Sequence, residues 1–360
     1  MLISVLIAVV SLIILFIVHE LGHFILARLF GMPVEEFGIG LPPRLISKKI
    51  KGIVYSINWI PFGAFVSIRG EDEKKESGPS FKDHPLWQRI IVFLGGVVAT
   101  WIAAAILYSL IAGIWGLPAQ INDDTEAFSA ELRITRVKEG SLAEEAGLVM
   151  GDKVIKIGSV GTSTKVNKIE DVDAFLKEYN QDPVELMVLR SGQETSFSVP
   201  ANNETATNTY RGIEIARVGY VPFSWWEAPQ VGLSVAANQT IEIPKQLSKI
   251  AYRYFAKGEK TPGVKFVGPV GVGETLSYAA EVGFNYLLQF VALIAIYLSI
   301  FNLLPLPALD GGKILLAIIG AIRGHEINPQ TENAINNIFF FAILALLFLV
   351  TIKDIIRLVT

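Results

Sequence analysis

The feature that most constrains this chain is the uneven distribution of its charged residues. Of its 360 residues, 51% are hydrophobic and only 18% are charged, and the mean hydropathy is +0.46. Soluble domains carry about 25% charged residues. Charge is missing from four stretches that approach or exceed the ~18 apolar residues needed to cross a bilayer: Leu2–Val18, Ile90–Asn122, Val282–Leu309 and Asn333–Ile352. We therefore predict four transmembrane helices, within residues 1–30, 90–116, 282–304 and 333–352.

The first of these stretches also has the length of a signal peptide. However, it has neither a basic leading segment nor a small-residue cleavage site, and its pattern continues through His23 to Leu29. We expect a retained helix.

The loop between the first two stretches, residues 31–89, predicts how the chain is oriented. Nine Lys and Arg residues lie between Arg44 and Arg89, so the positive-inside rule places this loop in the cytoplasm and residues 117–281 on the other side. Within the loop, Gly52–Ile68 is rich in β-branched and aromatic residues around Pro61-Phe62-Gly63. We interpret it as a β-hairpin with its turn at that tripeptide. Because the segment is so apolar, we expect it to associate with the membrane.

The overall charge and the absence of cysteine exclude several kinds of function. A formal net charge of −3 argues against a nucleic-acid partner. With no cysteine, neither a disulfide framework nor a thiolate metal site can form. Any metal must be bound by His, Asp or Glu, and the chain has only four His.

The region between the second and third stretches has the composition of a soluble domain. Residues 128–220 alternate strand-like and helix-like segments: Glu131–Val137, Lys153–Val160, Asp171–Tyr179 (helix-like), Val184–Arg190 and Glu194–Val199. The segment Gly140–Leu148, followed by Gly151-Asp152, resembles a PDZ domain. Such modules bind extended peptides at a sheet edge, although a simple spacer domain is the alternative. Residues 221–281 follow, and Trp225–Lys260 within them has the pattern of an interfacial helix.

The first stretch ends in the sequence His19-Glu20-Leu21-Gly22-His23. Positions i and i+4 share one face of a helix, so the two imidazoles can converge on one metal ion. Glu20 lies about 100° around the helix from His19, within reach of a metal-bound water whose pKa zinc lowers to about 7. Two unrelated histidines are the alternative, but an ionisable cluster deep in an apolar helix is costly unless it is functional.

A catalytic zinc usually takes three protein ligands, and Asp310 is the best candidate for the third. It is the first charge after the third stretch and lies within Asn302–Gly312 (NLLPLPALDGG), part of the segment 305–332. Capping of the helix that contains Lys313 is an alternative role, compatible with metal binding. His84 and His325 lie in charged loops, and we interpret them as surface histidines.

The sequences HELGH (19–23) and NLLPLPALDGG (302–312) are similar to the paired motifs of the site-2 protease family, peptidase family M50. The arrangement of spans resembles the bacterial regulator-of-sigma-E protease branch, here with a single PDZ domain. The resemblance implies an α-helical multi-pass membrane protein with four transmembrane helices, a membrane-associated β-hairpin and an inserted extracytoplasmic PDZ-like α/β domain. It also implies one Zn²⁺ per chain, bound by His19, His23 and Asp310, with Glu20 as the general base.

The same resemblance implies how a substrate is held. Residues 40–70 would receive it as an added strand, with Ile57, Asn58 and Gly63 in that element and Asn302 as a further contact. Two positions depart from the family pattern: Thr100 stands where an Asn-like residue is expected, and Lys313 where a His often follows the glycines. Neither departure affects the metal ligands.

The function implied is intramembrane cleavage of single-span membrane proteins, such as an anti-sigma factor or remnant signal peptides. The implied location is the bacterial inner membrane, with the catalytic site near its cytoplasmic side. The partners are then the lipid bilayer, the substrates and a peptide ligand of the PDZ-like domain. A metal or proton transporter and a PDZ-bearing scaffold are the alternatives. A transporter would require further ionisable residues along the second and fourth stretches, and these stretches carry none. A scaffold would leave the motif pair unexplained.

Overall fold

The computed structural model describes residues 2–71, 78–124, 128–138, 140–159, 161–179, 181–190, 192–201, 211–258, 268–325 and 327–359. Lys74 and Lys75 of the basic loop lie outside these ranges. The chain divides into two compact units. The first comprises Met1–Ile111, Ala228–Ser248 and Phe266–Thr360, and the second Ala112–Glu227 and Lys249–Lys265.

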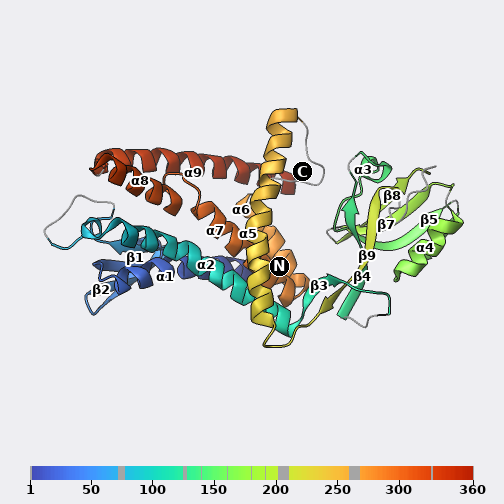
Figure 1. Ribbon diagram of the computed structural model, residues 1–360, viewed down its shortest axis with the longest axis horizontal. Helices are drawn as coiled ribbons and strands as arrows, with labels where there is room; N and C mark the ends of the chain where they lie inside the picture. Colours follow the sequence, from blue (N-terminus) through green and yellow to red (C-terminus); the bar gives the residue numbers. More distant parts are fainter. Residues whose placement is uncertain are drawn as a thin grey trace. The chain divides into compact units, whose positions relative to one another are not determined.

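The first unit is built mainly of helices (Figure 1): α1 Leu2–Leu29, α2 Leu86–Ile114, α5 Ala228–Tyr252, α6 Pro269–Val282, α7 Phe284–Asn302, α8 Asp310–Arg323 and α9 Pro329–Val359. In the described chain, four helical segments are long and apolar enough to cross a membrane: Val9–Leu29, Leu86–Ile114, Phe284–Asn302 and Gln330–Asp354. This confirms the four apolar helices expected from the sequence. On α9, Phe341 and Phe348 are 63% and 65% exposed, an apolar surface suited to contact with lipid.

Two helices contact each other through glycines. A Cβ atom on Gly22 of α1 would lie 2.1 Å from the carbonyl oxygen of Gly95 on α2, so only glycine allows this approach. Small residues at such crossings let helix backbones meet in a membrane, where van der Waals packing drives association. The crossing lies beside the His-Glu motif and places α2 against it.

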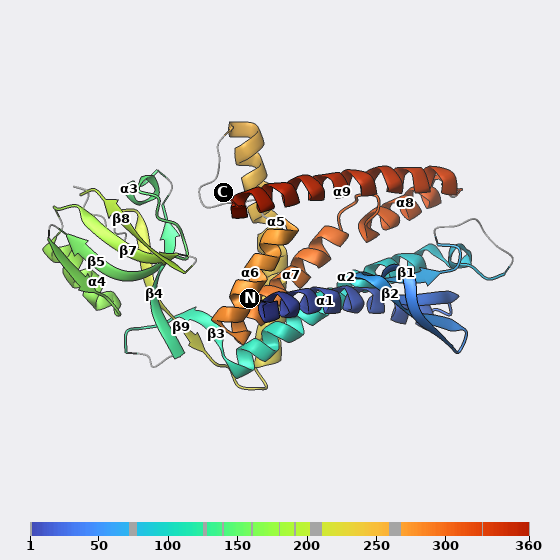
Figure 2. The same ribbon diagram turned by 180° about the vertical axis from the view of Figure 1, so that it is seen from behind.

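Helix α5 runs across the direction of α2 and α9, as Figures 1 and 2 show from opposite sides. Trp101 on α2 donates a hydrogen bond from Nε1 to Oγ1 of Thr240 on α5 at 2.9 Å. The assignment of this helix to the membrane interface stays a prediction. The helix ends in a short π-helix, Arg253–Lys257.

The β-hairpin differs from the expectation. Strands β1 (Val34–Ile50) and β2 (Ile53–Ile68) are joined at Lys51-Gly52, where both φ angles are positive (50° and 87°). Such a pair of residues suits a two-residue hairpin connection. Pro61-Phe62-Gly63 lies inside β2, so the turn predicted at 61–63 was wrong. The residue pattern did not predict the strand before Gly52, because Pro42 and Pro43 interrupt the alternation of side chains there.

The hairpin also folds back on itself. Phe37 of β1 has Cα partners in both halves of β2, Tyr55 and Val66. The first half of β1 therefore lies between the two halves of β2. Among the described pairings, this leaves two edges, one at Arg44–Ile50 and the other at Ala64–Ile68. Both are available for pairing with another strand.

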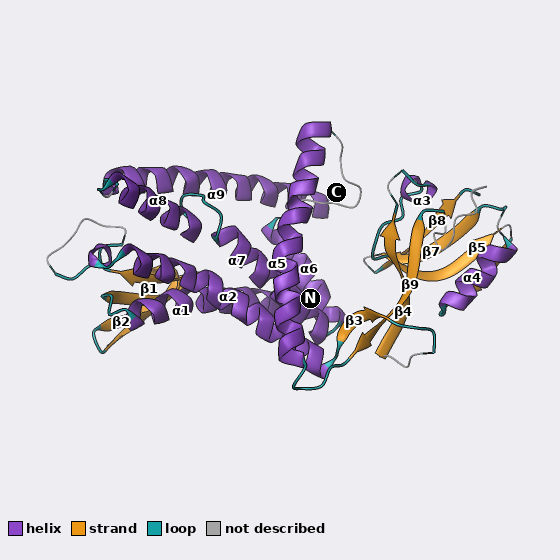
Figure 3. Ribbon diagram, in the orientation of Figure 1, coloured by secondary structure: helices purple, strands orange, loops and turns teal. Residues whose placement is uncertain are grey.

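The second unit consists mainly of strands (Figure 3). They are β3 Leu117–Gln120, β4 Phe128–Val137, β5 Lys153–Ser159, β6 Thr162–Lys165, β7 Val184–Arg190, β8 Gln193–Val199 and β9 Ile213–Val221, with helices α3 Leu142–Glu145 and α4 Ile169–Glu178. The sheet order is β3-β9-β4-β5-β7-β8, and β6 pairs with β5. Strands β4, β5, β7 and β8 and helix α4 occupy the segments that the sequence pattern indicated, whereas β3, β6 and β9 were not anticipated. The PDZ-like assignment of 128–220 stays a prediction.

An ion pair between Asp152 and Arg190 anchors the segment Gly140–Asp152, which suggested the PDZ-like domain. The Asp152 carboxylate is 1% exposed and accepts hydrogen bonds from Arg190 Nε at 2.7 Å and Nη2 at 2.6 Å. These hydrogen bonds raise the pKa of the Arg190 guanidinium above its ordinary value. The backbone N–H of Val149 also donates to Asp152, at 3.1 Å. The Gly151-Asp152 element therefore joins the α3 loop to β7.

Replacing Asp152 with Ala should loosen this unit locally, because the half-buried Arg190 side chain then loses its carboxylate partner. A partly buried pair of this kind contributes roughly 2.7 kcal/mol, the free energy of a hundredfold change. Amide hydrogen exchange in β5 and β7 of the full chain should therefore speed up about a hundredfold. Glu214→Gln is the control, because its ion pair with Arg136 is exposed (43% and 71%). Equal exchange in both variants would refute this role for Asp152.

Candidate metal centre and active site

Helix α1 presents His19 and His23 on one face, toward the interior of the first unit. Each residue is 7% exposed. Nδ1 of His23 lies 2.8 Å from the backbone carbonyl oxygen of Val92 on α2. That carbonyl can only accept a hydrogen bond, so Nδ1 carries the proton and Nε2 is left with a free lone pair. This is the arrangement of a metal-binding histidine oriented by a second group.

Asp310, the first residue of α8, lies beside the two histidines. Helix α7 ends at Asn302, and the chain turns sharply before α8 begins at Asp310. Gly311 and Gly312 make the tight turn possible. Cβ atoms there would lie 2.3 Å from the Leu303 carbonyl oxygen and 2.1 Å from that of Leu306. The two glycines thus allow the first turn of α8 to pack directly on the preceding loop.

The three side chains converge on one point. His19 Nε2 lies 3.2 Å from His23 Nε2, and Asp310 Oδ2 lies 3.0 Å and 3.4 Å from these two nitrogens. Zinc bonds N and O ligands at ~2.0–2.2 Å, and tetrahedral geometry then keeps ligand atoms about 3.4 Å apart. Within the described residues, these three are the group whose donor atoms could hold a metal ion. The donor set and spacing fit zinc.

Glu20 lies beside this cluster and is held by the hairpin. The backbone N–H of Val66 donates to Glu20 Oε2 at 3.1 Å. Val66 belongs to the Ala64–Ile68 edge of the sheet, so this edge faces the catalytic motif. One carboxylate oxygen of Glu20 is therefore bound by the strand.

Together these residues line a cavity of about 210 Å³. We call it the catalytic cavity. Its walls come from α1, α2, the hairpin edge and α8: Glu20, His23, Phe65, Val66, Ile68, Glu71, Val92, Phe93, Asp310 and Lys313.

Val66, Glu71 and Gly96 belong to this region, although no pattern in the sequence indicated that they do. A Cβ on Gly96 would lie 2.4 Å from His23 Nε2 and 2.7 Å from His19 Nε2. The small residues of the second stretch were a signal for close helix packing, but not for packing against the histidines. Val66 and Glu71 carry no sequence signal, because their positions depend on how the hairpin folds.

The structure does not bring the other predicted substrate-binding residues to the catalytic cavity. Asn58 is 5% exposed and donates from Nδ2 to the Gly40 carbonyl oxygen at 3.1 Å, within the hairpin. Ile57 is 50% exposed and lines an apolar groove between α1 and the hairpin. Gly63 lies in β2, and Asn302 donates to the Leu298 carbonyl oxygen at 3.0 Å, within α7. Their roles toward substrate stay predictions.

The two departures from the family pattern have structural partners. Thr100 is fully buried, and its Oγ1 lies 2.8 Å from Ser299 Oγ, which joins α2 to α7. Lys313 forms an ion pair with Glu71, with Nζ 2.6 Å from Oε1.

His84 and His325 lie away from the metal cluster, and His84 Nδ1 lies 2.9 Å from Gln88 Oε1.

Comparisons with known proteins show the family of this chain. Residues 7–346 match the model of peptidase family M50. A Clostridium perfringens protein that is named among the zinc metalloproteases is 33% identical over 345 residues, which are 95% of each chain. Zinc metalloprotease RasP of Geobacillus kaustophilus is 27% identical over 419 residues, covering 94% of each. An Enterococcus faecalis protein named as a protease, eep, is 26% identical over 431 residues, covering 96% of each.

The fold and the comparisons define a zinc metalloprotease with membrane-spanning helices. The chain belongs to peptidase family M50, the site-2 protease family, and its cofactor is Zn²⁺. Neither a transporter nor a scaffold is needed to explain it.

Substituting Gly96 with Ala should disturb the metal cluster, because the new methyl group would overlap both imidazoles. We expect the purified variant to hold well under half of the wild-type zinc, measured by atomic emission. Gly273→Ala is a matched control, since a Cβ at this helical glycine of α6 meets no atom within 4 Å. Full zinc content in Gly96→Ala would contradict the observed packing.

Proposed function

We propose that this protease is an intramembrane endopeptidase that cuts the transmembrane segments of single-span proteins. The observation that carries the proposal is the position of the cluster: His19, Glu20 and His23 lie inside the apolar span Val9–Leu29. A substrate bond that reaches them must enter the membrane-embedded unit. By the resemblance, suitable substrates are a regulator such as an anti-sigma factor, or remnant signal peptides.

In this proposal His19, His23 and Asp310 hold one zinc ion per chain. When bound, zinc supplies Lewis acidity toward a substrate carbonyl and makes water easier to deprotonate. Glu20 is the general base that accepts the proton of the attacking water and later gives it to the leaving amine. Val66 orients Glu20 through its N–H bond, and the carbonyl of Val92 orients His23.

The hairpin edge at Ala64–Ile68 is the proposed binding site for the substrate backbone. A helical peptide bond is shielded and already hydrogen-bonded, so the substrate must be extended before it is cut. Strand addition at a free edge stabilises that extended form. Because N–H groups alternate between the two sides of a strand, the Ala64 N–H points the same way as that of Val66, toward the catalytic cavity.

The remaining assignments follow from the resemblance and from charge distribution. The proposed location is a bacterial inner membrane, with the catalytic site near the cytoplasmic side and the 128–220 domain outside the cytoplasm. That domain would bind a peptide at a sheet edge. The basic loop 31–89 supports this orientation.

Glu20→Gln should keep about one zinc per chain but lose activity by about 10²–10⁴-fold, the usual contribution of a general base. Asp310→Ala should lose both zinc and cleavage, because one ligand is removed. Zinc content and cleavage of a single-span substrate in detergent measure these outcomes. His84→Ala, outside the cluster, should retain both. Normal cleavage by Glu20→Gln would eliminate the proposed mechanism.

Disulfide cross-linking tests strand addition, because the native chain has no cysteine. Ala64→Cys should cross-link to single cysteines near the scissile bond of the substrate with a period of two residues, as expected for paired strands. Ser47→Cys, on the Arg44–Ile50 edge, is the control and should give no such pattern. Cross-linking without periodicity, or equally from both edges, would argue against strand addition at Ala64–Ile68.

A further inference from the structure

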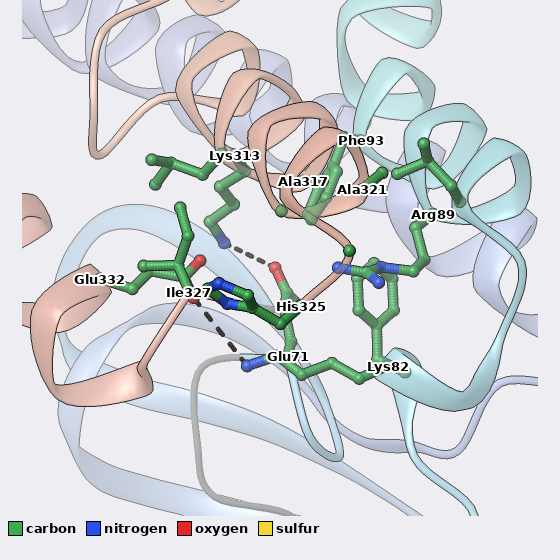
Figure 4. Close-up of a pocket in the computed structure, with 15 residues that line it drawn as sticks. Glu71, Lys82, Arg89, Phe93, Lys313, Ala317, Ala321, His325, Ile327 and Glu332 are labelled. Atoms are coloured by element: carbon green, nitrogen blue, oxygen red, sulfur yellow. Dashed lines mark hydrogen bonds and ion pairs between the residues drawn. The ribbon is translucent and has the colours of Figure 1, made fainter.

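A second cavity lies beside the catalytic cavity in the first unit. It has a volume of about 270 Å³ and is formed by the start of α2, the end of α8 and the start of α9. Figure 4 shows its charged side chains pointing into it. They are Glu71, Lys82, Arg89, Lys313, His325 and Glu332. Because so many ionic groups line it, and because it lies where the apolar spans begin, this cavity is suited to hold water.

The two cavities share one wall. Glu71, Phe93 and Lys313 line both of them. Lys313 Nζ lies 2.6 Å from Glu71 Oε1 and 5.7 Å from the centre of the Phe93 ring. The Glu71 and Lys313 side chains are 12% and 25% exposed. The ion pair between Lys313 and Glu71 therefore lies in the wall that the two cavities share, and Figure 4 shows it from the second cavity.

Hydrolysis needs a supply of water at a site surrounded by apolar helices. Each cut breaks one peptide C–N bond and consumes one water molecule: the water oxygen joins the acyl carbon to form a carboxylate, and both of its protons end on the released amine, which becomes an ammonium. The helix faces toward lipid offer no polar path. The second cavity, which charged side chains line and which adjoins the catalytic cavity, offers such a path.

We propose that the Lys313–Glu71 ion pair is a gate through which water passes from the second cavity into the catalytic cavity. The pair is suited to this role because it can open by side-chain rotation alone, without moving a helix. Lys313 stands on α8 one turn after Asp310, so the gate is fixed to the same helix as the proposed third zinc ligand. The inference rests on the proposed active site for the use of the water, but the gate itself can be measured without zinc or substrate.

Thiol labelling tests the gate, since a single introduced cysteine is the only thiol in the chain. Val66→Cys places it in the catalytic cavity, and a small charged methanethiosulfonate reagent is applied to the detergent-solubilised protein. If the closed pair leaves about 10% or less of the molecules open, Glu71→Gln should raise the labelling rate roughly tenfold or more. Lys313→Gln should do the same. The double substitution should add nothing further, because both changes remove one contact.

Two controls locate the effect. Glu332→Gln breaks the other ion pair of the second cavity, between Lys82 and Glu332 (3.9 Å), and should leave labelling of Val66→Cys unchanged. Ala317→Cys lies in the second cavity alone and should label at the same rate with and without the Glu71→Gln substitution. Filling the second cavity with Ala317→Trp should cancel the tenfold gain.

Several results would overturn the gate. One is fast labelling of Val66→Cys while the pair is intact, and another is an equal rate after Glu71→Gln. A gain that persists with Ala317→Trp would mean that the reagent enters by a different route. None of these results depends on proteolysis. A failure of the proposed function, seen as active Glu20→Gln, is therefore distinct from a failure of the gate.

Discussion

The first unit depends on one costly interaction: the burial of the Asp310 carboxylate against two imidazoles among apolar helices. A carboxylate in such surroundings is unfavourable unless a cation compensates it. The three donor atoms lie 3.0–3.4 Å apart. At this spacing one zinc ion can bind all three atoms, and no other described group of residues provides such a site. The glycines at 22, 95, 96, 311 and 312 give the backbones room to deliver these side chains. The same glycine contacts therefore pack the helices together and position the metal-binding side chains.

The hairpin connects the metal centre to the proposed substrate-binding edge. A single hydrogen bond, from Val66 N–H to Glu20 at 3.1 Å, sets the position of the proposed base relative to the sheet edge. The same edge is the proposed dock for an extended substrate. Because Val66 and Phe65 line the same cavity as Glu20 and Asp310, this proposed edge lies next to the metal-binding residues. Positioning of this kind can supply a large part of a rate enhancement.

The second unit is stabilised independently of this chemistry. Its core contains side chains from β4, β5, β7, β8 and β9 together with α3 and α4, and the Asp152–Arg190 pair ties the motif loop to the sheet. The Gly140–Gly151 segment that suggested a PDZ-like domain thus has a structural explanation of its own: Ser141 caps α3 and Asp152 is a buried anchor. Peptide binding by this unit is a separate question from its stability.

The sequence by itself determined the features that local patterns encode. Four uncharged stretches indicated the spans, and HELGH with LDGG indicated the zinc site, because helical spacing and a buried charge are readable from the chain. Only the tertiary structure decided the hairpin turn at Lys51-Gly52, the facing of Val66 toward Glu20, and the pairing of Lys313 with Glu71. The hairpin turn is local, but the other two join residues far apart in the chain, 46 positions for Val66 and Glu20 and 242 for Lys313 and Glu71. The proximity of these two pairs follows from how the helices and the sheet pack together, and no local pattern in the sequence specifies it.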